Sequence, residues 1–185
     1  MSEVQPIRDQ RKIREIDTYL KGKSDRDHIL WLVGVQSGLR VSDIVKLRVD
    51  DVWKQDIRRI KEKKTEKQRP LYLNSRSMTA IQRYIKEHDL QASDWLLPSR
   101  RSDGSGHISI TQAYRIIREA GEACGCSHVG THTMRKSFGY HYYKKTHDVA
   151  TLMRIFNHAS PSVTLRYIGI EREQIEDSLA DFYLL

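Results

Sequence analysis

The first third of the chain places apolar residues at helical spacing. Ile13, Ile16 and Leu20 share one helix face, because residues three and four positions apart lie on the same side. In the next segment the run Ile29–Val33 is apolar nearly all round, which is typical of a buried helix. The pattern therefore predicts an amphipathic helix packed beside a core helix.

Turn and cap residues delimit these helices. Residues 21–23, with a central glycine, are expected to end the first helix. Ser24 or Asp25 can cap the second helix with a side-chain oxygen, and Gly38 breaks it. Ser42 can cap a short third helix. The chain should therefore turn sharply around Gly38.

Residues 49–73 lose the helical period. Ile57–Ile60 and Pro70–Leu73 have β propensity and flank a basic turn, so they are predicted as paired short strands. Helical spacing then returns. The later helices are expected near residues 78–85, 110–121, 133–145, 148–156 and 161–168. The prediction is a mostly α protein with a small antiparallel β-sheet, an α+β fold.

Length and charge bound the class of protein. The 185 residues suit a single domain, 1–185, with a β-hairpin region at about 50–73 and a C-terminal tail at 171–185. Because no apolar run approaches membrane-spanning length and the start is polar, we expect a cytoplasmic protein without a membrane partner. Lys and Arg number 32 against 24 Asp and Glu, a net charge of +8, which fits a polyanionic partner.

The charge is concentrated in two places. Residues 58–69 hold seven basic and two acidic residues, whereas residues 171–181 hold five acidic residues and one arginine. A solvated surface is the simplest reading of the basic stretch. The acidic tail carries Ile175, Leu179 and Phe182 at helical spacing, so it either packs on its own domain or docks on a second copy.

Six side chains suit the handling of a phosphodiester. Guanidinium groups can bind two non-bridging oxygens at once, lysine and histidine can transfer protons, and tyrosine can attack phosphorus. Such a set needs no metal, and without a Gly-rich phosphate loop we expect no ATP or other cofactor. The candidate catalytic residues are Arg40, Lys64, His132, Arg135, His158 and Tyr167.

The local context of these residues supports grouping them. His132 and Arg135 are three positions apart, on one helix face. Ser160–Pro161 is a good helix start, so His158 lies at a joint between helices and Tyr167 near the end of the second. Taken singly, each is more simply a surface arginine or a core side chain. The case rests on their coincidence in one chain.

The order and spacing of the set resemble the tyrosine recombinases, the phage-integrase family. In that family an arginine follows a Thr/Ser-Gly-Leu turn, a lysine lies in a β-hairpin, and His-x-x-Arg, Gly-His and Tyr come late. Here the separations are 24 residues from Arg40 to Lys64, 23 from Arg135 to His158, and nine from His158 to Tyr167. The resemblance extends from about residue 13 to the C-terminus.

The resemblance implies a site-specific recombinase, an integrase of a mobile element, that cleaves and rejoins double-stranded DNA through a 3′-phosphotyrosyl intermediate. Tyr167 would attack the scissile phosphate, and Lys64 would protonate the leaving 5′-oxygen. His132 would assist proton transfer at the tyrosine. The two arginines and His158 would stabilise the charge on the phosphate.

Two assignments depend on the family pattern alone. Three further lysines lie near Lys64, which is chosen because it is the first lysine of Lys-Thr-x-Lys-x-Arg. Asp43, three residues after Arg40, matches an acidic family position and is expected to orient that arginine.

The resemblance also implies a homo-tetramer on synapsed DNA, assembled from protomers that are monomeric when free. Most members carry an N-terminal DNA-clamping domain, and this chain is expected to lack one, as do the compact inverting recombinases of fimbrial switches. It could also be an isolated catalytic fragment.

The rival functions are a type IB topoisomerase-like enzyme and a non-enzymatic DNA-binding regulator derived from an integrase. Cys124, Cys126 and His128 have neither the fourth ligand nor the usual spacing of a zinc site.

Overall fold

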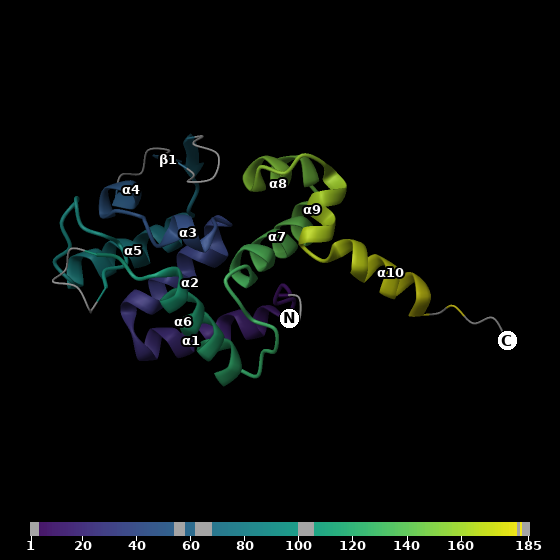
Figure 1. Ribbon diagram of the computed structural model, residues 1–185, viewed down its shortest axis with the longest axis horizontal. Helices are drawn as coiled ribbons and strands as arrows, with labels where there is room; N and C mark the ends of the chain where they lie inside the picture. Colours follow the sequence, from purple (N-terminus) through teal and green to yellow (C-terminus); the bar gives the residue numbers. More distant parts are fainter. Residues whose placement is uncertain (1–3, 54–57, 62–67, 100–105, 181, 183–185) are drawn as a thin grey trace.

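The computed structural model describes residues 4–53, 58–61, 68–99, 106–180 and 182. These residues are predominantly helical, as the sequence predicts (Figure 1). None of the described helices is long and apolar enough to cross a membrane. In chain order the elements are α1 (Gln10–Lys23), α2 (Asp25–Ser37), α3 (Val41–Ile44), α4 (Val49–Trp53), β1 (Arg58–Lys61), β2 (Gln68–Leu71), α5 (Ser75–Glu87), α6 (Ile110–Ala123), α7 (Thr133–Thr146), α8 (Val149–Phe156), α9 (Pro161–Tyr167) and α10 (Ile170–Ala180).

Helix α2 is the centre of the main core. It packs against α1, α5 and α7, and Trp31 at its middle is fully buried. The predicted cap is confirmed, because the Ser24 side chain accepts a hydrogen bond from the Asp27 amide. Gly38 ends α2 in the left-handed conformation, with φ 63°. A Cβ there would lie 2.5 Å from Phe138 Cδ1, so only glycine fits this corner.

One predicted helix boundary is confirmed and another was wrong. As predicted, α1 ends at residues 21–23: it runs to Lys23 and closes where the Ser24 amide donates to the Leu20 carbonyl at 2.9 Å. Ser42 does not cap α3. Its N-cap residue is Arg40, which makes no side-chain cap bond, because the turn at Gly38 already directs the chain into the helix.

A β-hairpin leads from α4 toward α5. Strands β1 and β2 pair antiparallel, with Arg58 opposite Leu71 and Lys61 opposite Gln68. The strands lie within one or two residues of the predicted segments. The residues between the two strands, which include Lys64, are outside the described residues.

Helices α7, α8 and α9 form a second, smaller core beside the first. Tyr140, Leu152, Phe156 and Ile168 are buried in it. Gly139 lets α7 approach closely, since a Cβ there would lie 2.7 Å from Ile168 and Phe156. Helix α7 packs on α2 on one side and on α8 on the other, so it joins the two cores.

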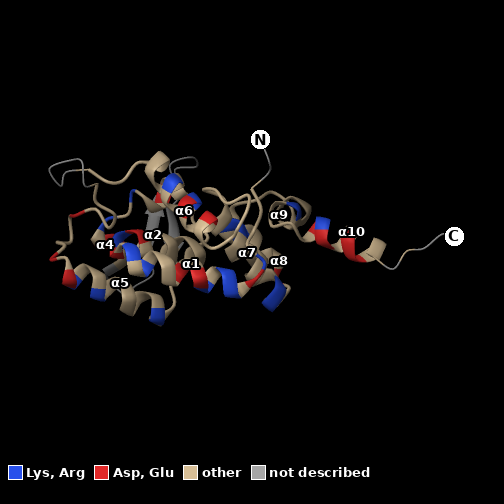
Figure 2. Cartoon of the chain, turned by 90° about the horizontal axis from the view of Figure 1, so that it is seen from below, with Lys and Arg blue, Asp and Glu red and all other residues tan. Residues whose placement is uncertain are grey.

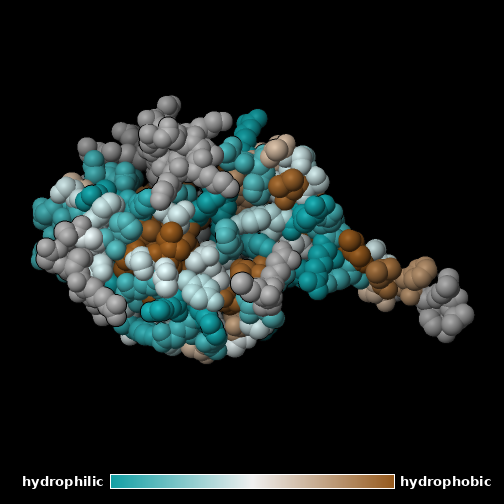
Figure 3. All heavy atoms as spheres, viewed as in Figure 1, coloured by the Kyte–Doolittle hydropathy of each residue, from teal (hydrophilic) through white to brown (hydrophobic). Residues whose placement is uncertain are grey.

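Helix α10 projects from the body of the molecule (Figures 1 and 2). Its first turn is anchored, because Glu173 forms ion pairs with Lys144 of α7 and with Arg8. Farther along, Ile175, Leu179 and Phe182 are 56%, 59% and 66% exposed. Figure 3 shows apolar atoms along this projection. Of the two alternatives, the one in which the stripe packs on its own domain is therefore wrong, and docking on a second copy stays a prediction.

Candidate active site

Arg135 lies at the junction of the two cores. Its side chain points inward from α7 and is only 2% exposed. One guanidinium nitrogen donates to the Gly38 carbonyl at 2.6 Å, and another donates to the Phe156 carbonyl at 2.9 Å. The group also stacks over the Phe156 ring, 4.3 Å from its centroid. Arg135 therefore ties together the ends of α2 and α8.

Arg40 comes two residues after Gly38 and remains partly exposed. Burial lowers the pKa values of His132 and His158, and the charge of Arg40 adds to that lowering; the same charge opposes the rise in the pKa of Tyr167. Asp43 is 5% exposed, and its amide donates to the Arg40 carbonyl at 2.9 Å. The α2–α3 corner thus presents a cation toward α7 and α9.

His158 lies between α8 and α9, at the predicted helix joint. The predicted helix start is confirmed, because Ser160 caps α9 and Pro161 is its first residue. His158 Nδ1 lies 3.0 Å from Thr164 Oγ1, one turn into α9. Burial, with the nearby charges of Arg135 and Arg40, lowers the pKa of His158 to about 4. The unliganded imidazole is therefore neutral at physiological pH.

Tyr167 ends α9 and lies against these groups. Its ring is edge-on to that of His158, at 5.1 Å between centroids, and its hydroxyl is 3.1 Å from His132 Nδ1. Burial raises the pKa of the phenol, while the charges of Arg135 and Arg40 oppose that rise. An acceptor for the phenolic proton therefore lies within hydrogen-bond reach.

His132 is the N-cap residue of α7 and is exposed to solvent on one side. Its pKa is lowered by partial burial and by the charges of Arg135, Lys136 and Arg40. A neutral imidazole next to a phenol can accept a proton. The position suits a general base.

The structure brings five of the six predicted residues together, while Lys64 lies outside the described residues. Two neighbours were missed by sequence reasoning. Thr164 is fully buried and contacts His158, and Lys136 is 7% exposed with its Nζ 5.3 Å from the centroid of the Tyr167 ring. A signal for both is their helical spacing, with Lys136 four residues after His132 and Thr164 three before Tyr167.

The arrangement suits an attack on an anion. Two guanidinium groups and two imidazoles surround one phenol, and planar donors of this kind match the oxygens of a phosphodiester. In the described part of the chain, no cluster of three or more His, Cys, Asp or Glu residues is placed to hold a metal.

Curated proteins match most of this chain in sequence. A probable integrase/recombinase of Bacillus subtilis, YoeC, is 46% identical over 170 residues, which cover 92% of each chain. The tyrosine recombinase XerA of Pyrococcus furiosus is 25% identical, over 86% of this chain and 56% of its own. XerC of Neisseria meningitidis is 29% identical, over 81% and 49%. The chain thus spans about half the length of the two Xer recombinases.

Solved structures share the fold. A XerA recombinase superimposes with a TM-score of 0.75 at 19% identity, covering 98% of this chain and 66% of that one. The XerH recombinase in a post-cleavage complex with its palindromic difH substrate gives 0.76 at 17% identity, covering 97% and 54%. The model of the phage integrase family matches residues 9–174. The chain therefore belongs to the phage integrase family of tyrosine recombinases.

Proposed function

We propose that this chain is the catalytic domain of a site-specific DNA recombinase that cleaves and rejoins double-stranded DNA through a 3′-phosphotyrosyl intermediate. The observation that carries the proposal is the 3.1 Å contact between the Tyr167 hydroxyl and His132, beside Arg135, Arg40 and His158. Membership of the family and the DNA complex of XerH support it.

In the proposed cleavage step the Tyr167 oxygen attacks the scissile phosphorus and the bond to the 5′-oxygen breaks. His132 takes the phenolic proton. Arg40 and Arg135 bind the non-bridging oxygens, whose negative charge grows in the transition state. His158 donates a hydrogen bond to the same oxygens. Since the phosphotyrosyl bond keeps the energy of the phosphodiester, rejoining needs no ATP.

Lys64 is the proposed general acid. The small antiparallel sheet would hold it at the turn between β1 and β2, from which a flexible lysine could reach the leaving 5′-oxygen. Asp43, buried beside Arg40, is proposed to orient that guanidinium.

A suicide substrate nicked near the scissile phosphate tests the cleavage chemistry, since it traps the covalent adduct. Tyr167→Phe removes one hydroxyl, so it should abolish the adduct while leaving DNA affinity within about twofold of wild type. Tyr114→Phe, on α6, is the matched control and should form the adduct normally. An adduct that persists in Tyr167→Phe would overturn the assignment. No adduct in wild type would favour the non-enzymatic regulator.

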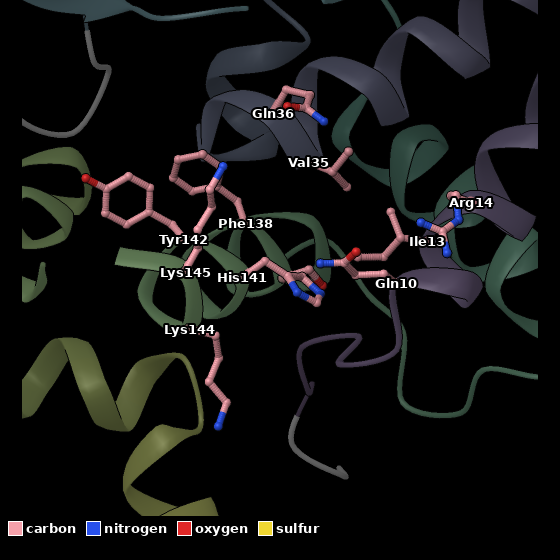
Figure 4. Close-up of a pocket in the computed structure, with 11 residues that line it drawn as sticks. Gln10, Ile13, Arg14, Val35, Gln36, Phe138, His141, Tyr142, Lys144 and Lys145 are labelled. Carbon is pink, nitrogen blue, oxygen red and sulfur yellow. The ribbon is translucent and has the colours of Figure 1, made fainter. Parts of the chain in front are cut away.

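We further propose that free protomers are monomeric and form a tetramer on synapsed DNA, linked by the tails. A groove of about 560 Å³ between α1, α2 and α7 can receive a neighbour's α10 (Figure 4). Its lining combines apolar Ile13 and Val35 with basic Arg14 and Lys145. This chemistry complements an acidic helix with an exposed apolar stripe. Exchange between such linked sites distinguishes a recombinase from a topoisomerase.

A further inference from the structure

Lys136 contacts the proposed nucleophile although the proton-transfer scheme gives it no role. It follows Arg135 on α7, and its backbone amide donates to the His132 carbonyl at 2.8 Å. The side chain is 7% exposed, and its Nζ lies 5.3 Å from the centre of the Tyr167 ring. A lysine is rarely buried to this degree unless its charge is compensated.

Lys136 and His132 approach Tyr167 from consecutive turns of one helix. His132 contacts the phenolic oxygen, and Lys136 lies by the aromatic ring. Phe156 and His158 contact the ring edge-on, at 5.5 and 5.1 Å between centroids. The tyrosine ring is therefore held by groups on α7, at the end of α8, and between α8 and α9.

A cation near an aromatic ring is attracted to the ring's electrons. That attraction grows as the phenol gives up its proton, because the ring then carries part of the negative charge. The same cation repels a proton on His132, and its charge contributes to the lowered pKa of that imidazole. The two effects act on different partners. The first stabilises the phenolate that remains, and the second keeps His132 unprotonated and so free to accept the proton, while making it a weaker base.

We propose that Lys136 is a positioning residue for the nucleophile, holding the Tyr167 ring against His132 and keeping that imidazole ready to accept the phenolic proton. The inference rests on the proposed function, in which Tyr167 is the nucleophile and His132 the base.

Several charged groups surround His132 and Lys136, so the test must separate the effect of Lys136 from theirs. His132 faces the cations Arg40, Arg135 and Lys136 and the phenol of Tyr167. On its other side, Lys136 borders a hollow of about 440 Å³ whose charged lining is Arg166, Glu171, Arg172 and Glu176. Substitution of the lysine alone changes the field at His132 without altering these groups.

The experiment measures single-turnover adduct formation on the nicked substrate across pH, with DNA affinity measured in parallel. Lys136→Met keeps the length of the side chain and removes its charge. We expect cleavage about tenfold slower, a change of about 1.4 kcal/mol in the barrier. The acid limb of the pH profile should move to higher pH, because His132 then binds a proton more readily. Lys136→Arg should restore most of the cleavage rate and bring the acid limb of the pH profile back to its wild-type position.

Matched controls separate the possible failures. Lys86→Met, at an exposed position on α5, makes the same change of charge and should leave the pH profile unchanged. Wild type without an adduct, or Tyr167→Phe with one, would defeat the proposed function itself. With both of those behaving as expected, a normal rate in Lys136→Met would overturn the inference. So would a slow rate in both Lys136 variants with the acid limb unmoved, which would make the lysine a packing residue only.

Discussion

Arg135 combines two roles that are usually assigned to different residues. Two of its N–H groups donate to the Gly38 and Phe156 carbonyls, and its charge also lies beside Tyr167 and His158. A group aimed at a phosphate must be rigid to be effective, and these backbone bonds supply the rigidity. Binding of the anion and stability of the fold therefore depend on the same guanidinium.

Arg135→Lys should accordingly lower both stability and cleavage. An ammonium cannot reach two carbonyls in one plane, and an unpaired buried carbonyl costs about 1–3 kcal/mol. Cleavage should fall by about 10²–10³, the usual effect of removing one transition-state donor. Thermal melts and adduct assays at a temperature where the variant is folded measure the two effects separately. Cleavage within about threefold of wild type would show that Arg135 is structural only.

His158 makes stability depend on pH. Its folded pKa of about 4 lies below the usual 6.5, so between these values the unfolded chain binds a proton that the folded chain does not. The contribution of His158 to the free energy of unfolding is complete above pH 6.5 and is lost as the pH falls to about 4. Denaturant unfolding should show the stability gap between wild type and His158→Asn narrowing over this range. A gap independent of pH would contradict the assignment.

At the scale of elements, two glycines have opposite roles. Gly38 makes the left-handed corner that delivers Arg40, whereas Gly22 lies inside α1 with no atom within 4 Å of its Cβ position. Gly38→Ala should destabilise the protein by about 1–3 kcal/mol and slow cleavage. Gly22→Ala should stabilise it by about 0.5–1 kcal/mol and leave cleavage unchanged. Chemical denaturation of both variants measures these changes in stability. Equal changes in the two variants would contradict the prediction.

These glycines also show how far sequence patterns reach. Helix periods and local caps such as Ser24 and Ser160 were predictable, because the residues that determine them are neighbours in the chain. The end of α1 at residues 21–23 was predictable in the same way. Gly22 lies within the last turn of this helix, where burial of Ile16 and Leu20 outweighs the modest cost of glycine.

Candidate site residues were easier to identify than their environments. The grouping of Arg40, His132 and Tyr167 follows from type and order, but burial depends on segments far apart in the sequence. The burial of Lys136 could not be predicted from the sequence, because it depends on packing against α9. The backbone partners of Arg135 could not be predicted either, because every residue has a carbonyl and its sequence does not say which one a distant side chain will contact.

At the scale of the molecule, substitutions in the projecting tail can test whether protomers assemble through it. Leu179→Asp with Phe182→Asp places charge on the exposed stripe and leaves the Glu173 anchor intact. We expect normal melting and single-site DNA binding, but synapsis and strand exchange reduced at least tenfold. Val35→Asp in the groove should have the same effect from the receiving side. Native gels and exchange assays measure this, and efficient exchange by the tail variant would refute docking.

The bonds of Arg135 also determine when during folding a competent site first exists. Its two carbonyl partners lie 97 and 21 residues away along the chain. Contacts of such separation close late, because the entropy of ordering the intervening loop must be overcome first. We expect the helices to form before this guanidinium reaches its place. A partly folded chain would then lack a positioned Arg135, and we expect it to cleave DNA only after these contacts have closed.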